Sequence, residues 1–424
     1  MNHSATVARR AARQRITVRC VNQTDELSGA VAPGRRLTIL LACPVGAWEG
    51  EGLVISTKFL EELQEYARLW PGPVRVIAEQ QESWSSAFGT QVVQPGQLPF
   101  ELILHSHANL DPRRVFEGSD VVLSASGTHY HDLSQQALTR GIPLVYVTEY
   151  SLKTARAIMR LETRSTLLRL RRELWLRQNH VRQRRSLQRA AAVQCNGTPT
   201  FSETEGVNER RLLYFDSRIF DDLVITDSAL TARHERMMAS SVPLRLVFSG
   251  RLDRMKGVQY LVPLARELSR LNVDCTLDIC GGGELATQLA EQVAESGLGS
   301  RVKIRGSLDF STQLMPFVRG DSDVFVCCHP QGDPSCTYLE MFACGVPCVG
   351  FANEALFGLA ERSKAVWLSP IGDIELLAKQ IGYLSSHRQE VMQHSQRALT
   401  FAQQHTFRLT YARRVEQLQT LTAG

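Results

Sequence analysis

The sequence predicts an α/β protein of two domains, each built on a mainly parallel sheet with helices packed on it. The chain has 424 residues, of which 43% are hydrophobic and 21% are charged, which is enough for two cores of ordinary size. Continuous apolar runs recur along the chain, as parallel strands buried on both faces require. Turn-forming residues and amphipathic segments follow these runs, so strand, loop and helix alternate.

The first half begins with an apolar run over residues 37–45, after an arginine-rich tail over residues 1–36 that lacks a signal-peptide core. The loop that follows carries Gly50, Glu51 and Gly52 and feeds a helix. Its glycines would let the backbone approach an acceptor molecule, and a plain surface turn is the alternative. Further strands are expected over residues 74–78, 102–105, 121–124, 142–147, 191–197 and 212–218.

Two polar residues at the ends of these runs are candidates for an interdomain site. Glu149 directly follows an apolar run, and its alternative role is that of an acid at a helix start. Arg218 ends the last run, where a surface ion pair with Asp216 is the alternative to a place in the site.

Residues 153–189 are unusually basic, with twelve Lys and Arg against two Glu. Leucines and Trp175 are interleaved without Gly or Pro, which predicts one or two helices. Basic helices rich in Leu and Trp are typical of anionic membrane surfaces. The alternative is that the apolar stripe packs on the sheet and the arginines form a solvated face.

In the second half, an apolar run over residues 244–248 is followed by Gly250, Arg251, Lys256 and Gly257 and then by an amphipathic helix. An arginine fork and a lysine point charge before a helix N-terminus can hold a pyrophosphate, although two exposed basic residues would give the same pattern.

Three further runs complete this half. Residues 276–280 lead into a glycine triplet and Glu284, whose amides can face an anion. Residues 302–306 form the next predicted strand, and residues 324–328 precede a turn and a helix that carries Glu340. A carboxylate in the first turn of that helix suits a vicinal diol such as a ribose, although Glu340 taken alone is better explained as a solvated acid at a helix start.

Together these stretches resemble the retaining glycosyltransferases of family 4. Gly250, Arg251, Lys256 and Gly257 match that family's Gly-Arg, four residues, Lys-Gly pattern. The resemblance implies the GT-B architecture, in which two Rossmann-like domains with parallel sheets face each other across a cleft. It implies donor-binding roles for Gly250, Gly257, Gly282, Gly283, Glu284, Arg305, Asp333, Pro334, Ser335, Cys336, Thr337 and Glu340.

The same resemblance implies that Arg251 and Lys256 stabilise the leaving diphosphate and that a histidine lies near the reacting centre. His129 is the candidate, and an ordinary surface His-x-His is its alternative. The family also has two glutamates separated by seven residues. Glu340 fits the second, but Gly332 stands at the first position, with Asp333 one place later. Either Asp333 substitutes for that glutamate, or backbone groups of residues 333–336 hold the donor sugar.

The resemblance divides the chain into a tail (1–36), an acceptor-binding domain (37–226), a linker (227–243), a nucleotide-sugar domain (244–404) and a helix crossing back to the first domain (405–424). It implies a retaining transferase that uses a nucleotide-diphosphate sugar and a glycan or lipid-linked acceptor, in exopolysaccharide or cell-envelope glycan synthesis. A catalytically degenerate protein that binds nucleotide and membrane and regulates a partner is the alternative.

Composition restricts the partners and the location. The net charge of +5 is modest, so no nucleic-acid partner is expected, and no metal-ligand cluster or cofactor motif is present in the sequence. Ten scattered cysteines fit a reducing cytoplasm. No apolar run approaches about 18 residues. The expected location is therefore the cytoplasm or the inner face of the cytoplasmic membrane.

Overall fold

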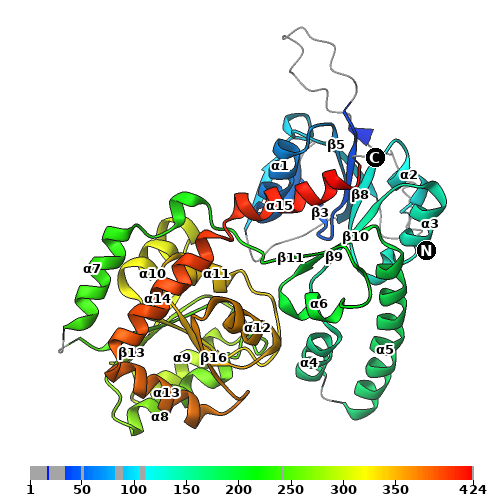
Figure 1. Cartoon of the computed structure of the whole chain (residues 1–424). Coiled ribbons are helices and arrows are strands. Elements are labelled where there is room, and N and C mark those ends of the chain that lie inside the picture. Colours follow the sequence, from blue (N-terminus) through cyan, green and yellow to red (C-terminus); the bar gives the residue numbers. More distant parts are fainter. Residues whose placement is uncertain are drawn as a thin grey trace, which may run out of the picture. The chain divides into compact units, whose positions relative to one another are not determined.

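The computed structural model describes residues 17–18, 34–48, 52–81, 89–105, 110–163, 165–239 and 242–422. It divides into two compact units, residues 1–124 and 125–424, and both are α/β (Figure 1).

The first unit is centred on four parallel strands in the order β8-β2-β5-β7. They are β2 (Leu37–Leu40), β5 (Val74–Gln81), β7 (Glu101–His105) and β8 (Val121–Ala125). Short strands extend this sheet, namely β1 (Thr17–Val18), β3 (Val45–Ala47), β4 (Leu53–Ser56) and β6 (Thr90–Val93). The helices of the unit are α1 (Thr57–Leu69), α2 (Pro112–Phe116) and the 3-10 turn η1 (Pro95–Gln97).

The apolar run at residues 37–45 is not one strand, contrary to the sequence prediction. β2 ends at Leu40 and β3 begins at Val45, directly after Pro44, which has no backbone N–H to donate to a ladder. β3 then pairs with β4 in an antiparallel hairpin, and the Trp48 amide donates to the Gly52 carbonyl at 3.0 Å. The glycine loop therefore joins two strands before α1 begins. Gly52 is buried there, and Gly50 and Glu51 lie outside the described residues.

The second unit contains two sets of parallel strands. The three strands β9 (Leu144–Thr148), β10 (Ala192–Asn196) and β11 (Arg211–Tyr214) pair in the order β11-β10-β9 and are called the smaller sheet below. Its helices are η2 (Thr128–Tyr130), α3 (Leu133–Arg140), α4 (Leu152–Glu162), α5 (Thr166–Arg189), α6 (Thr198–Glu203) and η3 (Asp221–Leu223). β11 ends four residues before the predicted boundary, so Asp216 and Arg218 belong to the loop that follows it.

The larger sheet has six parallel strands in the order β14-β13-β12-β15-β16-β17. The strands are β12 (Leu244–Ser249), β13 (Cys275–Cys280), β14 (Val302–Gly306), β15 (Val324–Cys327), β16 (Cys348–Phe351) and β17 (Val366–Ser369). Its helical segments are α7 (Asp227–Met238), η4 (Val258–Tyr260), α8 (Leu261–Arg270), α9 (Ala286–Glu295), η5 (Phe310–Leu314), α10 (Met315–Asp321), α11 (Thr337–Ala343), α12 (Glu354–Ser363) and α13 (Ile374–Ser386).

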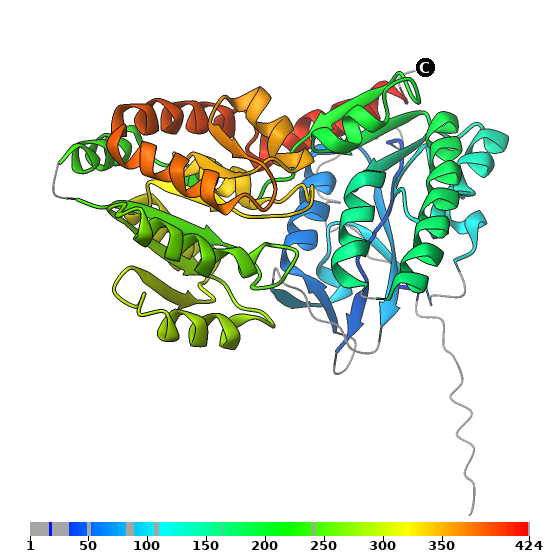
Figure 2. The same cartoon turned by 90° about the horizontal axis from the view of Figure 1, so that it is seen from below.

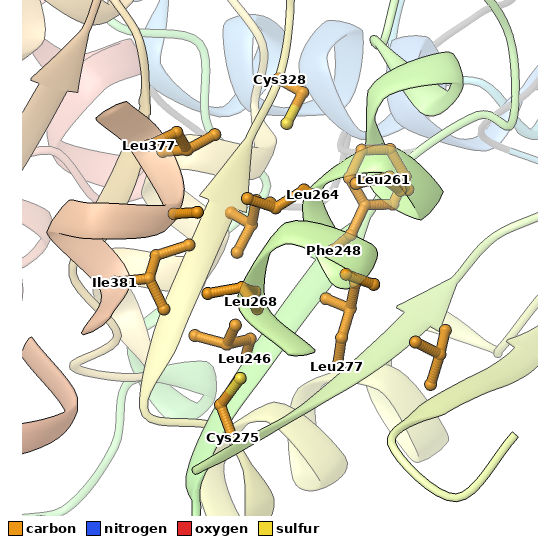
Figure 3. Packing of buried hydrophobic residues seen from close by; sticks show 14 of the residues in the cluster. Leu246, Phe248, Leu261, Leu264, Leu268, Cys275, Leu277, Cys328, Leu377 and Ile381 are labelled. Atoms are coloured by element: carbon orange, nitrogen blue, oxygen red, sulfur yellow. The ribbon is translucent and has the colours of Figure 1, made fainter. Parts of the chain in front are cut away.

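One face of the larger sheet is sealed by α8 and α13. Leu264 and Leu268 of α8 and Leu377 and Ile381 of α13 pack with Leu246 of β12 in one buried cluster (Figure 3). Because β12 lies between β13 and β15, the loops at the carboxyl ends of these three strands are neighbours. Ligands of open parallel sheets bind at such ends.

The chain ends with two helices, α14 (Arg388–Gln403) and α15 (Phe407–Thr420). α15 contacts the smaller sheet of the same unit, where Arg414 Nε donates to Gln194 Oε1 at 2.8 Å and Gln194 Nε2 donates to the Arg414 carbonyl at 3.0 Å. These contacts join the last helix of the chain to a strand more than 200 residues earlier.

Candidate functional site

The loop after β12 brings a buried lysine to the loop after β15. Lys256, 8% exposed, donates from Nζ to the Asp333 carboxylate and to Ser335 Oγ at 3.3 Å. Its backbone amide is fixed by Asp253 Oδ1 at 2.9 Å. Arg251 is exposed on the same loop, with Nη2 3.4 Å from Asp253 Oδ2. The predicted pair of cations is therefore present, with one member buried and one at the surface.

Close backbone packing explains the glycines of these loops. Gly257 has φ of +74°, and a Cβ there would lie 1.9 Å from the carbonyl oxygen of Cys328. A Cβ on Gly281 would lie 1.9 Å from the carbonyl oxygen of Gly250. Only residues without a Cβ let the three loops approach so closely.

The glycine triplet after β13 is held against the β12 loop. The Leu252 amide donates to the Gly282 carbonyl at 2.9 Å, and a Cβ on Gly283 would lie 2.6 Å from the Leu252 carbonyl oxygen. Glu284 is exposed and precedes α9, which begins two residues later than the sequence suggests. The triplet thus has a packing role, and its part in anion binding stays a prediction.

Arg305, one of the residues predicted to bind the donor, is held by contacts within its own unit. Its Nε donates to Asp278 Oδ1 at 2.7 Å, and its guanidinium lies 4.4 Å from the ring centroid of Phe317. These contacts fix the side chain at the end of β14.

Asp333 is the carboxylate that meets Lys256. Burial alone would raise the pKa of Asp333, but Lys256, with a smaller contribution from Arg251, favours the charged form more strongly and lowers that pKa. Asp333 is thus an ionised acceptor beside a buried ammonium.

Gly332, at the position of the resembled family's first glutamate, has no room for a side chain. A Cβ there would lie 2.6 Å from Thr154 Oγ1 and 3.0 Å from the Cβ of Glu354. Thr154 Oγ1 also donates to the Gly332 carbonyl at 3.3 Å. Glu354 is held in place by Ser151 Oγ at 2.6 Å. Neighbouring elements therefore occupy the space that a glutamate would need.

Glu340 lies in the first turn of α11, which Thr337 begins, and is 2% exposed. Arg218 donates to Glu340 Oε1 from Nε at 2.9 Å and from Nη2 at 2.6 Å. Burial alone would lower the pKa of Arg218, but the Glu340 carboxylate raises it above its ordinary value. The guanidinium also lies 3.9 Å from the ring centroid of Phe310, in the segment after β14.

Sequence reasoning did not find this pairing, because the two residues are 122 positions apart and no local pattern connects them. It could place Arg218 only at the end of an apolar run.

The remaining residues of the 333–336 loop border a small pocket. Cys336 Sγ donates to Asp216 Oδ2 at 3.2 Å. Pro334 and Ser335 line the pocket from one side, and Asn196 and Asp216 line it from the ends of the smaller sheet. Polar groups from both sheets of the second unit therefore meet at this loop.

His129 and Glu149 are both exposed, His129 after β8 and Glu149 after β9. His129 lies in η2. Two positions later, His131 is buried with its Nε2 3.3 Å from the Ser126 carbonyl oxygen, and burial lowers the pKa of His131. The catalytic role of His129 and the acceptor-side role of Glu149 stay predictions.

These features define a two-domain α/β protein with parallel sheets, and its architecture is the GT-B fold. Residues 239–400, which contain the whole larger sheet of the second unit, match the family described as Glycosyl transferases group 1. The residues predicted to bind the donor, from Gly250 to Glu340, all lie within that match.

Two relatives match part of the chain. The putative colanic acid biosynthesis glycosyltransferase WcaL of Salmonella typhimurium is 26% identical over 163 residues, which are 36% of this chain and 38% of WcaL. The amylovoran biosynthesis glycosyltransferase AmsK of Erwinia amylovora is 27% identical over 164 residues, 35% of this chain and 38% of AmsK. The match thus spans well under half of either relative.

A solved structure is similar over most of the chain. Anabaena Alr3699/HepE in complex with UDP gives a TM-score of 0.62 at 13% identity and covers 91% of this chain and 99% of that one. At this identity the likeness shows the fold.

Proposed function

We propose that this chain is a retaining glycosyltransferase that takes a sugar from a nucleoside-diphosphate donor and transfers it to a glycan or lipid-linked acceptor. The observation that carries this proposal is the meeting of Lys256, Asp333 and Ser335 at the carboxyl ends of β12 and β15, with Arg251 on the same loop. The group 1 match over residues 239–400 supports the same chemistry.

In this mechanism the leaving diphosphate binds at the β12 loop. Arg251 forks onto one phosphate, and Lys256 turns from Asp333 toward the other as negative charge develops. Because Lys256 is already held in a buried position, little reorganisation is needed at the moment of transfer. The acceptor hydroxyl attacks from the leaving-group side, and His129 lies near the reacting centre.

Glu340 and Asp333 bind the remaining parts of the donor, the ribose and the sugar. Glu340, oriented by Arg218 through Oε1, uses its other oxygen for the ribose hydroxyls. Asp333 accepts hydrogen bonds from donor-sugar hydroxyls in place of the absent glutamate. Position 332 cannot supply that glutamate, because Thr154 and Glu354 occupy the space that its side chain would need.

A polysaccharide pathway is the context we propose. WcaL is named for colanic acid biosynthesis and AmsK for amylovoran biosynthesis, and each matches about a third of this chain. The acceptor is accordingly a growing exopolysaccharide or cell-envelope glycan.

Donor turnover tests the proposal. The purified chain is incubated with UDP-, GDP- and ADP-sugars and with cell-envelope glycan or lipid fractions. Released nucleoside diphosphate is measured, and the anomeric configuration of the product is read by NMR. Arg251→Ala is expected to lower turnover at least a hundredfold, whereas Arg254→Ala, also exposed on this loop, serves as the matched control.

The outcomes separate the two functions. Transfer with retained configuration supports the proposal, and transfer with inversion contradicts its mechanism. Nucleotide binding that depends on Arg251, without turnover of any donor, would instead identify a degenerate GT-B protein that regulates a partner.

A further inference from the structure

The long helix α5 exposes a cluster of large apolar side chains. Six of the sixteen large apolar side chains that are exposed among the described residues lie on this one helix. They are Leu167 (82% exposed), Leu168 (41%), Leu170 (61%), Leu174 (54%), Trp175 (53%) and Val181 (48%). Such a concentration on one element marks an interaction surface.

Most of these side chains lie on the side of α5 that faces away from its unit. The spacing of three, four and seven residues places four of them on one side of the helix, namely Leu167, Leu170, Leu174 and Val181. The residues that α5 does bury are Ser186 and Leu187, near its carboxyl end. Figures 1 and 2 show α5 beside α4 at the outside of the second unit. The apolar stripe therefore does not pack on the sheet, which was the alternative that the sequence left open.

The charge of this helix is strongly positive. It carries eight arginines and a single acid, Glu173, which already pairs with Arg156 at 2.7 Å and Arg177 at 2.9 Å. Six other arginines of α5 are exposed, and two of them, Arg169 and Arg172, donate to Thr163; the remaining four are Arg171, Arg182, Arg185 and Arg189. By helical spacing, Arg171 and Arg185 lie along one edge of the leucine stripe. Excess positive charge thus lies beside exposed leucine and tryptophan.

We propose that this α5 face, made of Leu167, Leu170, Leu174, Trp175, Val181, Arg171 and Arg185, docks along the surface of an anionic lipid bilayer. The leucines and Trp175 enter the boundary between headgroups and acyl chains, and the arginine stems reach back to lipid phosphates. Among the described residues no helix is long and apolar enough to cross a membrane, so the helix lies in the surface plane.

Charge and apolarity together select this partner over others. A nucleic acid would use the arginines but leave the leucine stripe in water, and an apolar partner protein would leave the arginines without counter-charges. An anionic bilayer satisfies both groups at once. The inference goes beyond sugar transfer, and because its test uses no nucleotide, either proposal can fail without the other.

Vesicle co-flotation of the full chain tests the docking. Wild type is expected to float with phosphatidylcholine vesicles that contain phosphatidylglycerol and to bind pure phosphatidylcholine much less. Leu170→Ser/Leu174→Ser is expected to weaken binding at least tenfold. Its control is Leu138→Ser on α3, a leucine of matching exposure at 55%.

A second variant, Arg171→Gln/Arg185→Gln, tests the contribution of charge and is expected to weaken binding roughly thirtyfold. Lys303→Gln/Arg408→Gln removes the same charge from exposed sites outside α5 and should bind like wild type. All substituted side chains are exposed, so each variant should melt like wild type, and this is checked by circular dichroism.

Four results would overturn the docking. Wild type that ignores anionic vesicles excludes it, as do leucine variants that bind normally. Self-association that the leucine variants abolish, without vesicle binding, would show that a second copy covers the face. Binding to nucleic acid that depends on the arginines alone would show that the leucines play no part.

Discussion

Replacing Lys256 by alanine leaves the buried Asp333 carboxylate without its cation, and the resulting loss of stability can be worked out from the structure. The side chains of Lys256 and Asp333 are 10% and 16% exposed. Removing one member of a fully buried ion pair costs about 3–5 kcal/mol, and the residual exposure here reduces the expected loss to about 2–3 kcal/mol. In the double variant Lys256→Ala/Asp333→Asn no charge is stranded, so most of that loss should be recovered.

Urea denaturation of the wild type, both single variants and the double variant at pH 7 measures these terms. We expect a coupling free energy of about 2 kcal/mol between the two positions. Calorimetry then measures nucleotide binding at the candidate site. Asp333→Asn should bind a bare nucleoside diphosphate more tightly than wild type, because a phosphate about 6 Å from the carboxylate would be repelled by up to about 3 kcal/mol at an effective dielectric constant of 20.

The same Asp333→Asn variant should turn over sugar donors more slowly, since the sugar loses its acceptor. Additive single-variant effects, together with unchanged binding of the diphosphate by Asp333→Asn, would refute the reasoning that this ion pair forms part of the donor site.

Three further perturbations test neighbouring parts of the site and the core. Arg218→Ala should cost about 3 kcal/mol of stability, measured by denaturation, because it leaves Glu340 buried without its partner. Because Glu340 also loses its orientation, calorimetry should show no preference for a nucleoside diphosphate over its 2′-deoxy form. Arg218→Lys should keep part of the stability and part of the preference. Gly332→Glu, which restores the family's glutamate, should lower both stability and turnover by overpacking, at a cost of about 1–3 kcal/mol, and a more active variant would show that position 332 has room. His405 is enclosed by aromatic rings, and burial lowers its pKa to about 4. Because the unfolded chain binds this proton below about pH 6.5, wild type should lose up to about 3 kcal/mol between pH 6.5 and 4, and His405→Gln should show a flatter pH dependence of its denaturation midpoint.

The larger sheet of the second unit was the most predictable part of the molecule. The strand expected over residues 302–306 is β14 (Val302–Gly306), and the one expected over 276–280 is β13 (Cys275–Cys280). β13 is mostly apolar because it is buried, whereas β14 lies at the sheet edge and alternates apolar with charged residues. Glycine or polar residues end each run, so the sequence alone marks the boundaries of both strands.

Short and edge elements were harder to predict. The hairpin of β3 and β4 was missed because its strands are three and four residues long and the apolar run before it continues through the bend at Pro44. β11 was predicted too long because Phe215 continues the apolar pattern beyond Tyr214, the last residue of the strand.

The partners of the site residues could not be predicted from local patterns. Lys256 and Glu340 were identified by their spacing, but Asp333 and Arg218 as their ion-pair partners follow only from how distant segments pack. The same holds for Gly332, where Thr154, 178 residues earlier, fills the space of the missing side chain. Contacts between such distant residues leave no periodicity in the sequence.

Calorimetric titration of UDP, GDP and ADP into wild type, Arg251→Ala and Arg254→Ala tests the central claim most directly. We expect one of these diphosphates to bind wild type and Arg254→Ala equally well and to bind Arg251→Ala at least tenfold more weakly. The three proteins should have the same melting temperature in the absence of ligand. Equal binding to all three proteins, or no binding of any diphosphate to wild type, would contradict the placement of the donor site at the β12 loop.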